Sequence, residues 1–256
     1  MEFKKWLYLE RRNNSLTQLL NRSCSFLMFL YANNNFKNES SSLQSIPAEL
    51  LDSSSCGKWC SWIKKFNPRF ESNPKQKVVC GSEGCALFVG NKIVIKFTHG
   101  RDEATIATLI KGNPNFPVID TTYYNGIYAI AMKELNNISF SSPLRYTIAV
   151  ARDIITEFLS YENINVNGNL YEQYKKWYEL FKKQSNEIDQ EELNFSYRLV
   201  ELIDIIKDKT GYALGHDWGY YNLGVDDQNQ VQPFDFGYPK TKYGNPKTTE
   251  IPSLEQ

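Results

Sequence analysis

The chain has 256 residues, which is enough to bury a substantial core in one folded unit with an additional segment. Its 29 basic and 29 acidic side chains give a formal net charge of zero, and this balance excludes a general electrostatic attraction for nucleic acids. Five cysteines, an odd number, favour thiols in a reducing compartment such as the cytoplasm over a disulfide framework. Two of them, Cys80 and Cys85, are expected to be buried and inert thiols.

Residues 1–75 are predicted to form a mainly helical N-terminal extension. Helical segments are expected over 1–32 and 48–66, with a linker rich in Asn and Ser over 33–45. The longest apolar run there, residues 26–32, is too short to cross a bilayer, so no membrane contact is expected. The extension carries no recognisable chemistry, and we expect it to pack on the segment that follows or to bind a partner.

A strand–turn–strand unit is predicted over residues 77–97, because apolar β-branched runs lie on both sides of the tight-turn pair Gly90-Asn91. A short loop ahead of this turn contains Gly81, Ser82 and Gly84. Glycines in such a loop let backbone N–H groups approach an anion without hindrance from a Cβ atom. A plain β-hairpin is the alternative interpretation.

Lys96 lies on the last strand of this unit and shares a face with Val94. The segment 102–111 is predicted to be a short helix, whose apolar residues repeat at helical spacing with Glu103 on the same face. A carboxylate on a buried face is unexpected unless it is paired, and Lys96 is the natural partner. The separation of seven residues requires a compressed entry to the helix. The alternatives are an exposed strand lysine and an exposed first-turn acid.

Two further strands are predicted over 116–123 and 127–132, joined by Asn125-Gly126, which is a strong hairpin signal. The chain leaves the second strand through Met132, Glu134 and Leu135. Met132 is either a core residue or part of a site beside the strand end.

The middle of the chain is predicted to be helical. Ser142-Pro143 is typical of a helix N-terminus, with serine as the cap and proline in the first turn. A later helix has one apolar face over 195–206, with Lys207 in its last turn and Gly211 as its C-terminal cap.

The most specific signal is the spacing of Asp217, Asn222 and Asp235, the last of which is followed by Phe236-Gly237. Asn222 follows Asp217 by five residues, and Asp235 follows Asn222 by thirteen. Phosphoryl transfer needs a carboxylate to orient and deprotonate the attacking hydroxyl, and a carboxylate with an amide oxygen to hold Mg²⁺ against the phosphates. This spacing is typical of a kinase catalytic loop followed by a DFG motif.

The motif order over residues 77–240 resembles the protein-kinase-like superfamily. Gly215-His216-Asp217, without arginine, is similar to the aminoglycoside phosphotransferase branch and to compact kinase-like proteins of tailed bacteriophages. The resemblance implies an α+β, two-lobed protein-kinase-like fold, with an antiparallel-sheet N-lobe over 76–135 and a reduced helical C-lobe over 136–256. A cytoplasmic location is expected, in the host cell if the chain is viral.

The same resemblance implies ATP and Mg²⁺ as cofactors. Asp217 would be the catalytic base, and Asn222 and Asp235 would hold Mg²⁺. Lys96, paired with Glu103, would bind the α- and β-phosphates. The remaining nucleotide contacts would come from the glycine loop and from a hinge after the last strand: Gly81, Ser82, Gly84, Met132, Glu134 and Leu135.

The chain departs from the family pattern after Asp235. Nineteen residues follow Gly237, without an APE motif, so an activation segment and control by its phosphorylation are not expected. Gly219 occupies the place of a lysine that many Ser/Thr kinases carry two residues after the catalytic Asp. Its absence removes one positive charge near the γ-phosphate.

Three classes of function stay open. The first is a Mg²⁺·ATP-dependent Ser/Thr protein kinase with a minimal C-lobe. The second is a phosphotransferase acting on the hydroxyl of a small molecule, of the aminoglycoside or choline type. The third is a nucleotide-binding, inactive regulator. The presence of the complete motif set argues against the third class, because a binding module needs no catalytic base.

Overall fold

The computed structural model describes residues 57–71, 77–81, 84–138, 142–159, 164–165, 168–182, 189–212, 222–236 and 247–254, together with Pro47 and Trp218. Residues 44–256 belong to one compact unit of the chain. The predicted helix over 1–32 and the predicted linker over 33–45 lie outside the described residues. None of the helices in the described ranges is long and apolar enough to cross a membrane.

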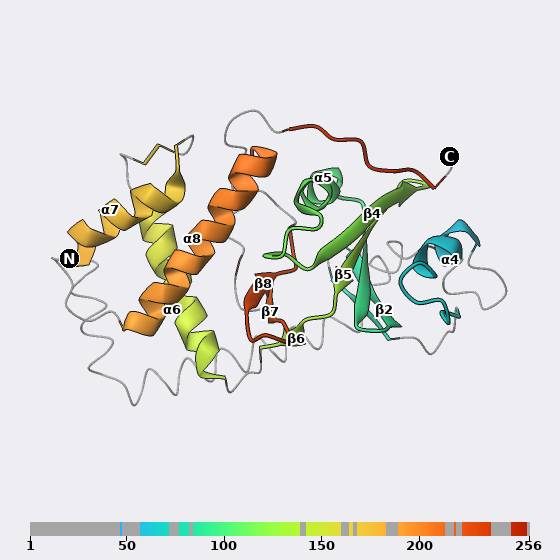
Figure 1. Cartoon of the computed structure of the whole chain (residues 1–256), viewed down its shortest axis with the longest axis horizontal. Coiled ribbons are helices and arrows are strands. Elements are labelled where there is room, and N and C mark those ends of the chain that lie inside the picture. The colour runs from blue at the N-terminus through green and yellow to red at the C-terminus, as the bar shows by residue number, and fades with distance from the viewer. Residues whose placement is uncertain are drawn as a thin grey trace. The chain divides into compact units, whose positions relative to one another are not determined.

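A five-stranded antiparallel sheet has the strand order β1-β2-β3-β5-β4. Its strands are Val78–Cys80 (β1), Gly84–Gly90 (β2), Ile93–Thr98 (β3), Val118–Tyr124 (β4) and Ile127–Lys133 (β5). Helix α5 (Arg101–Ile110) connects β3 to β4. The α+β class is confirmed, with an antiparallel sheet followed by helices (Figure 1).

Left-handed backbone torsions form the two tight turns of the sheet. Asn125 and Gly126 have φ values of 49° and 80°, which suit the two central positions of a type I′ hairpin turn. At the other turn Lys92 also has a positive φ, 56°. β3 therefore begins at Ile93, one residue later than the sequence pattern indicates.

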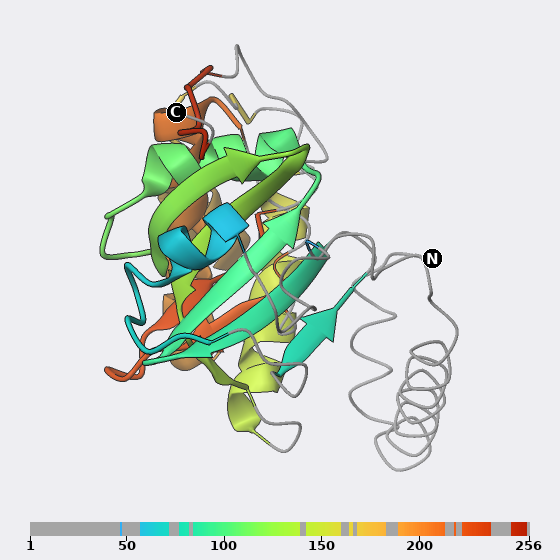
Figure 2. The same cartoon turned by 90° about the vertical axis from the view of Figure 1, so that its right-hand side faces the viewer.

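Side chains along β3 point alternately to the two faces of the sheet. Ile95 and Phe97 are buried in one core cluster with Trp59 and Trp62 of helix α4 (Gly57–Ile63). The rings of Trp59 and Phe97 meet edge to face, with centroids 5.2 Å apart. Figure 2 shows α4 lying against the sheet. Part of the predicted N-terminal extension thus packs on the sheet.

The opposite face of the sheet contributes Ile130 and Met132 of β5 to a second core cluster. This cluster is shared with α5 and with helices α6 (Pro143–Leu159) and α8 (Gln190–Thr210). Because successive strand residues point to opposite faces, Lys96, between Ile95 and Phe97, points toward α5 and the helices beyond it. The strand period therefore decides which way the lysine faces.

The ends of these helices follow their capping residues. The Leu144 N–H donates a hydrogen bond to Ser142 Oγ at 3.3 Å. At the end of α8, Gly211 has a φ of 73°, and its N–H donates to the Lys207 carbonyl at 2.7 Å. The predicted start of α6 and the predicted cap of α8 are both confirmed.

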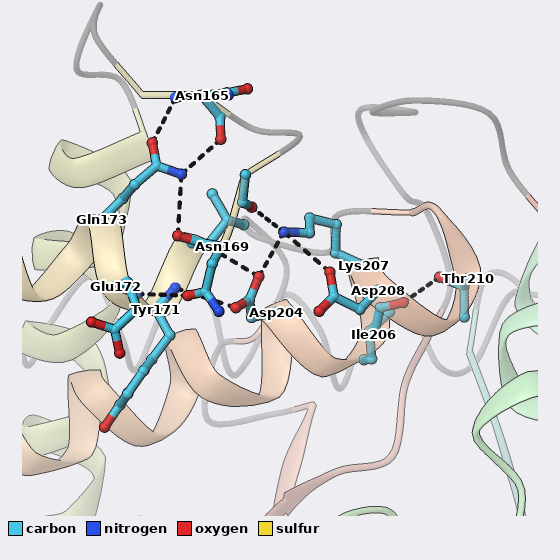
Figure 3. Close-up of polar contacts among 12 residues, drawn as sticks. Asn165, Asn169, Tyr171, Glu172, Gln173, Asp204, Ile206, Lys207, Asp208 and Thr210 are labelled. Atoms are coloured by element: carbon cyan, nitrogen blue, oxygen red, sulfur yellow. Dashed lines mark hydrogen bonds and ion pairs between the residues drawn. The ribbon is translucent and has the colours of Figure 1, made fainter.

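A buried polar network joins α8 to the start of helix α7 (Leu170–Lys182) (Figure 3). Asp204 accepts hydrogen bonds from the backbone N–H groups of Leu170 at 3.0 Å and Tyr171 at 3.4 Å. Its carboxylate also lies 2.7 Å from Lys207 Nζ. Asp204 thereby satisfies N–H groups that the first turn of α7 leaves unpaired, and Lys207 compensates its buried charge.

A three-stranded sheet follows the first one, with strands Asn136–Asn137 (β6), Leu223–Val225 (β7) and Val231–Pro233 (β8). It lies between helices α6 and α8 and the five-stranded sheet in Figure 1.

The segment 247–254, which we call the strap, connects the end of α8 to β4, an edge strand of the larger sheet. The Lys247 N–H donates to the Thr210 carbonyl at 2.8 Å. At β4 the Tyr123 N–H donates to the Pro252 carbonyl at 2.8 Å, and the Leu254 N–H donates to the Tyr123 carbonyl at 3.0 Å. Figure 1 shows the strap in red, running from α8 toward β4.

Candidate active site

Lys96 is the centre of a charged cluster that joins the sheet to the residues after β8. Its Nζ atom lies 2.5 Å from Glu103 Oε1 and 2.9 Å from Asp235 Oδ1. The expected ion pair between Lys96 and Glu103 is therefore formed. Asp235, 139 residues further along the chain, joins the same pair.

Burial and charge act in opposite directions at this cluster. The side chain of Lys96 is 14% exposed and that of Glu103 only 3%. Burial lowers the pKa of Lys96, but the carboxylates of Glu103 and Asp235 outweigh it and hold the pKa above its ordinary value. Burial raises the pKa of Glu103, and the Lys96 ammonium opposes that shift. The side chain of Lys96 is thus positively charged, and two carboxylates fix its orientation.

The connection between β3 and α5 explains how Glu103 reaches Lys96 over so few residues. β3 ends at Thr98 and α5 begins at Arg101. The Gly100 N–H donates to Thr98 Oγ1 at 3.0 Å, which folds the chain back at once. A Cβ atom at Gly100 would lie 3.2 Å from Thr98 Oγ1, so the bend is tight. Glu103 then falls in the first helical turn, where the helix dipole favours a carboxylate.

A β-hairpin accounts for the spacing of thirteen positions from Asn222 to Asp235. β7 and β8 pair antiparallel, with Leu223 opposite Pro233. The Phe234 N–H donates to the Asn222 carbonyl at 3.1 Å and extends the ladder by one position. Asn222 and Asp235 therefore leave the hairpin at the same end.

The side chains at this end of the hairpin suit a magnesium ion. Carboxylate and amide oxygens are ligand types that Mg²⁺ accepts, and it retains several waters besides them. The Asp235 side chain is 35% exposed, which leaves room for solvent. Within the described ranges, no cluster of three or more His, Cys, Asp or Glu side chains forms a separate metal site.

Phe236 anchors the chain next to Asp235. It is fully buried, and its ring meets that of Phe116 edge to face, with centroids 6.2 Å apart. Phe116 belongs to the core cluster shared with α5. The packing of Phe236 holds the backbone beside Asp235 while the carboxylate of Asp235 contacts Lys96.

The glycine loop is closed by its own backbone. The Gly81 N–H donates to the Gly84 carbonyl at 2.9 Å, so this donor is already engaged. A Cβ atom at Gly84 would overlap the carbonyl oxygen of Phe97, whereas a Cβ atom at Gly81 would meet nothing within 4 Å. Gly84 is thus required by close packing against β3. Ser82 lies outside the described residues.

Cys80 and Cys85 form a disulfide bond, so the expectation of two thiols is wrong. The two residues are directly opposite each other in the β1–β2 ladder. Opposite residues of an antiparallel pair point to the same face with their Cβ atoms close together, which brings the sulfur atoms within bonding reach. The bond closes the loop that contains Gly81 and Gly84.

The residues predicted as a hinge lie where β5 ends. Met132 is 4% exposed and belongs to the core cluster, as one of its two interpretations requires. The Glu134 N–H donates to the Lys92 carbonyl at 2.8 Å. Leu135 lies against Gly224, where an added Cβ atom would be 2.5 Å from the Cβ atom of Leu135. Contact of these residues with adenine stays a prediction.

Asp217, the predicted catalytic base, lies outside the described residues, as does Gly219. Trp218 is described, and it is 3% exposed and part of the core cluster. This aromatic side chain therefore has a packing role. The role of Asp217 stays a prediction based on its spacing from Asn222.

Two side chains that contact the first turn of α5 are not identified from sequence. The hydroxyl of Thr98 forms a hydrogen bond with Glu103. The hydroxyl of Tyr212 donates to Asp102 Oδ1 at 2.9 Å, across 110 residues of chain. A role for Thr98 could have been predicted from its position at the end of the strand. No local pattern reveals a contact as distant in sequence as that of Tyr212.

No protein-family model matches the chain, and no curated protein matches it by sequence. Among solved structures, 23 chains match. One is the GDP and kanamycin complex of APH(2")-IIia, which is 11% identical, with 68% of this chain and 69% of that chain covered and a TM-score of 0.31. A likeness at this TM-score supports no conclusion about function, which must rest on the chain's own residues.

Proposed function

We propose that the chain is a Mg²⁺·ATP-dependent phosphotransferase. The observation that carries the proposal is the contact of one largely buried lysine, Lys96, with both Glu103 and Asp235. A lysine that binds nucleotide phosphates must be charged, oriented and close to the acid that holds the metal ion. The Asn222 carbonyl accepts a hydrogen bond from the Phe234 N–H, so Asn222 leaves the hairpin at the same end as Asp235, and in the proposal its side-chain amide oxygen supplies a second ligand for the metal ion.

In this proposal Lys96 binds the α- and β-phosphates, and Glu103 keeps its ammonium group oriented. Asp235 and Asn222 hold Mg²⁺, which would neutralise the negative charge that develops on the phosphates. Asp217 orients the acceptor hydroxyl for in-line attack and accepts its proton. The acceptor oxygen forms a bond to the γ-phosphorus as the bond to ADP breaks.

The remaining nucleotide contacts are proposed for the glycine loop and the hinge. Ser82 and Gly84 would cover the phosphates. Gly81 would contribute through its small size, because its N–H is engaged by the Gly84 carbonyl. The hinge residues Met132, Glu134 and Leu135 would bind adenine through backbone groups other than the Glu134 N–H, which the Lys92 carbonyl engages.

For the acceptor we propose a Ser or Thr hydroxyl of a protein, which the spacing from Asp217 through Asn222 to Asp235 favours. A small-molecule hydroxyl is the second candidate. Two sequence features favour it: Gly215-His216-Asp217 lacks the arginine of protein kinases, and Gly219 occupies the place of their loop lysine.

The acceptor class is tested with labelled γ-phosphate. Mg²⁺·ATP carrying the label is added to a bacterial lysate with the wild-type protein or with Asp217→Ala. Labelled protein bands that are absent with Asp217→Ala support a protein kinase. Label in the small-molecule fraction supports the second candidate. Tight ATP binding with no transfer to either fraction would contradict both and indicate a nucleotide-binding regulator.

We propose the cytoplasm as the location of this reaction, in the host cell if the chain is viral, because ATP is the proposed phosphate donor. The disulfide between Cys80 and Cys85 argues the other way, since reducing compartments keep most thiols free. Blocking free thiols at the moment of cell lysis, followed by mass measurement, shows which state the pair has in cells. Blocked thiols at both positions support the cytoplasmic location.

A further inference from the structure

Tyr212 lies between α8 and the segment that carries Asp217. It follows Gly211, the left-handed cap of α8, and it precedes Asp217 by five residues. Its side chain is 4% exposed, and its hydroxyl donates to Asp102 Oδ1 at 2.9 Å. Asp102 is in the first turn of α5, next to Glu103. One hydrogen bond thus joins the helix that orients Lys96 to the chain that leads to the proposed base.

The backbone at Tyr212 is held firmly by α8. The Tyr212 N–H donates to Thr210 Oγ1 at 3.1 Å, and that hydroxyl donates to the Ile206 carbonyl at 2.7 Å. The Thr210 carbonyl accepts a hydrogen bond from the Lys247 N–H of the strap at 2.8 Å. A tyrosine side chain has only two χ angles, so a fixed backbone leaves its hydroxyl few positions. Tyr212 is therefore a rigid donor.

The rotation of α5 about its own axis depends on directional contacts. Its apolar side chains Ile106, Ala107 and Ile110 are buried in the core cluster shared with α8. Apolar burial holds the helix against the core but is not directional, so it sets the rotation of the helix only weakly. A hydrogen bond depends on distance and angle. Near the end of α5, Thr108 Oγ1 lies 2.8 Å from Thr121 Oγ1 of β4. The bond to Asp102 adds a directional contact in the first turn, one residue away from Glu103.

We propose that Tyr212 is a positioning residue for phosphoryl transfer: through Asp102 it sets the rotation of α5, and so keeps the Glu103 carboxylate in place against Lys96. This role rests on the proposed phosphotransferase function. In this scheme Tyr212 touches neither nucleotide nor acceptor. Its loss should therefore lower kcat and leave the KM for ATP nearly unchanged.

Four variants separate the hydrogen bond from general packing. Tyr212→Phe removes the hydroxyl and keeps the ring. Asp102→Ala removes the acceptor, whereas Asp102→Asn keeps an oxygen that can accept the same bond. Tyr174→Phe is the matched control, because Tyr174 is 0% exposed and its hydroxyl lies 2.6 Å from Ser196 Oγ of α8 instead of contacting α5.

For γ-phosphate transfer we expect Tyr212→Phe and Asp102→Ala each to lower kcat by about tenfold, the effect of losing one hydrogen bond to a charged group. The KM for ATP should stay within about twofold, since kcat alone responds to an interaction that matters in the transition state. Asp102→Asn should retain most of the wild-type kcat, and so should Tyr174→Phe. Combining Tyr212→Phe with Asp102→Ala should cause little loss beyond that of Asp102→Ala alone, because Asp102→Ala has already removed the bond that Tyr212→Phe removes.

Hydrogen exchange measures the position of α5 without relying on catalysis. Backbone amides in peptides over 101–110 should exchange faster in Tyr212→Phe than in the wild type, while peptides over 143–159, in α6, should not change. Unchanged exchange over α5, an unchanged kcat, or an equal loss in Tyr174→Phe would overturn the proposal. A wild-type protein that transfers no phosphate would overturn the proposed function and, with it, this role of Tyr212. A wild-type protein that does transfer phosphate shows that any of the three outcomes above counts against the role of Tyr212 alone.

Discussion

The single residue Glu103 shows how burial changes the contribution of an ion pair to stability. Its side chain is 3% exposed and contacts Lys96. Glu172 and Lys175 of α7 form a pair of similar length, 2.8 Å, but their side chains are 56% and 43% exposed. Exposed pairs often contribute nothing measurable to stability, whereas removing one member of a buried pair leaves a charge without compensation.

We therefore expect Glu103→Ala to lower the free energy of unfolding by roughly 3 kcal/mol, because Lys96 would lose the more deeply buried of the two acids that pair with it in the described part of the chain. Glu172→Ala should leave the unfolding midpoint unchanged. Urea denaturation of both variants gives the comparison. If the two substitutions had the same effect, the Lys96–Glu103 pair would behave as a surface pair and our description of the cluster would be wrong.

The two glycines of the loop differ in what surrounds them, although the sequence pattern treats them alike. A Cβ atom at Gly84 would overlap the backbone of Phe97, and one at Gly81 would be in open space. Gly84→Ala should lower the free energy of unfolding by about 1–3 kcal/mol, the usual cost of overpacking. Gly81→Ala should have almost no effect. Thermal unfolding of the two variants tests this, and equal melting temperatures would contradict it.

Among the elements, the β1–β2 hairpin combines backbone pairing with a covalent bond between Cys80 and Cys85. Treatment with iodoacetamide without reductant should leave both cysteines unlabelled in the purified protein. Reduction should lower the free energy of unfolding by about 2 kcal/mol, the size expected for a short closed loop. The hairpin should nevertheless persist, since Val78 and Val79 keep their partners across the ladder. Labelling of both cysteines before reduction would show that the bond is absent.

Elements whose ends carry a local chemical signal are predictable from sequence. Asn125-Gly126 indicates its turn because both residues tolerate positive φ, and Gly211 marks the end of α8 for the same reason. Lys92 is misassigned to a strand because lysine rarely adopts positive φ, and its neighbours give no warning. The bond between Cys80 and Cys85 is missed because a cysteine count carries no information on strand register.

At the scale of the whole molecule, the contacts that assemble the site join distant parts of the chain. Lys96 and Asp235 are 139 residues apart, and Tyr212 and Asp102 are 110 apart. Motif order predicts that Lys96 and Asp235 share a site only by resemblance to a known family. Nothing in the local sequence predicts the bond from Tyr212 to Asp102, because it depends on how α5 packs against α8.

The strap, residues 247–254, is also a long-range feature. It hydrogen-bonds to Thr210 at the end of α8 and to Tyr123 on the edge strand β4. Removing residues 247–256 would expose the N–H and C=O groups of that edge, which can then pair with another chain. We expect a lower melting temperature together with increased self-association, measured by light scattering.

Leu254→Ala serves as the control for the truncated chain. It keeps the backbone hydrogen bonds of the strap and removes only the side chain that packs against the core cluster on the α4 face of the sheet. This variant should lose some stability without associating. A truncated chain that stays monomeric and melts at the wild-type temperature would show that the strap contributes nothing to the fold.

The most direct measurement is the rate at which Lys96→Met and Lys92→Met transfer labelled γ-phosphate from Mg²⁺·ATP. This rate bears on every step of the proposed function. Lys92 is the matched control, since it precedes the same strand and pairs with Asp227 at 2.8 Å, with both side chains about 70% exposed. We predict that Lys96→Met lowers the rate by at least about 100-fold, because a preorganised charge at the phosphates is lost, while Lys92→Met transfers at the wild-type rate. Transfer by Lys96→Met at the wild-type rate would contradict the assignment of this cluster as the active site.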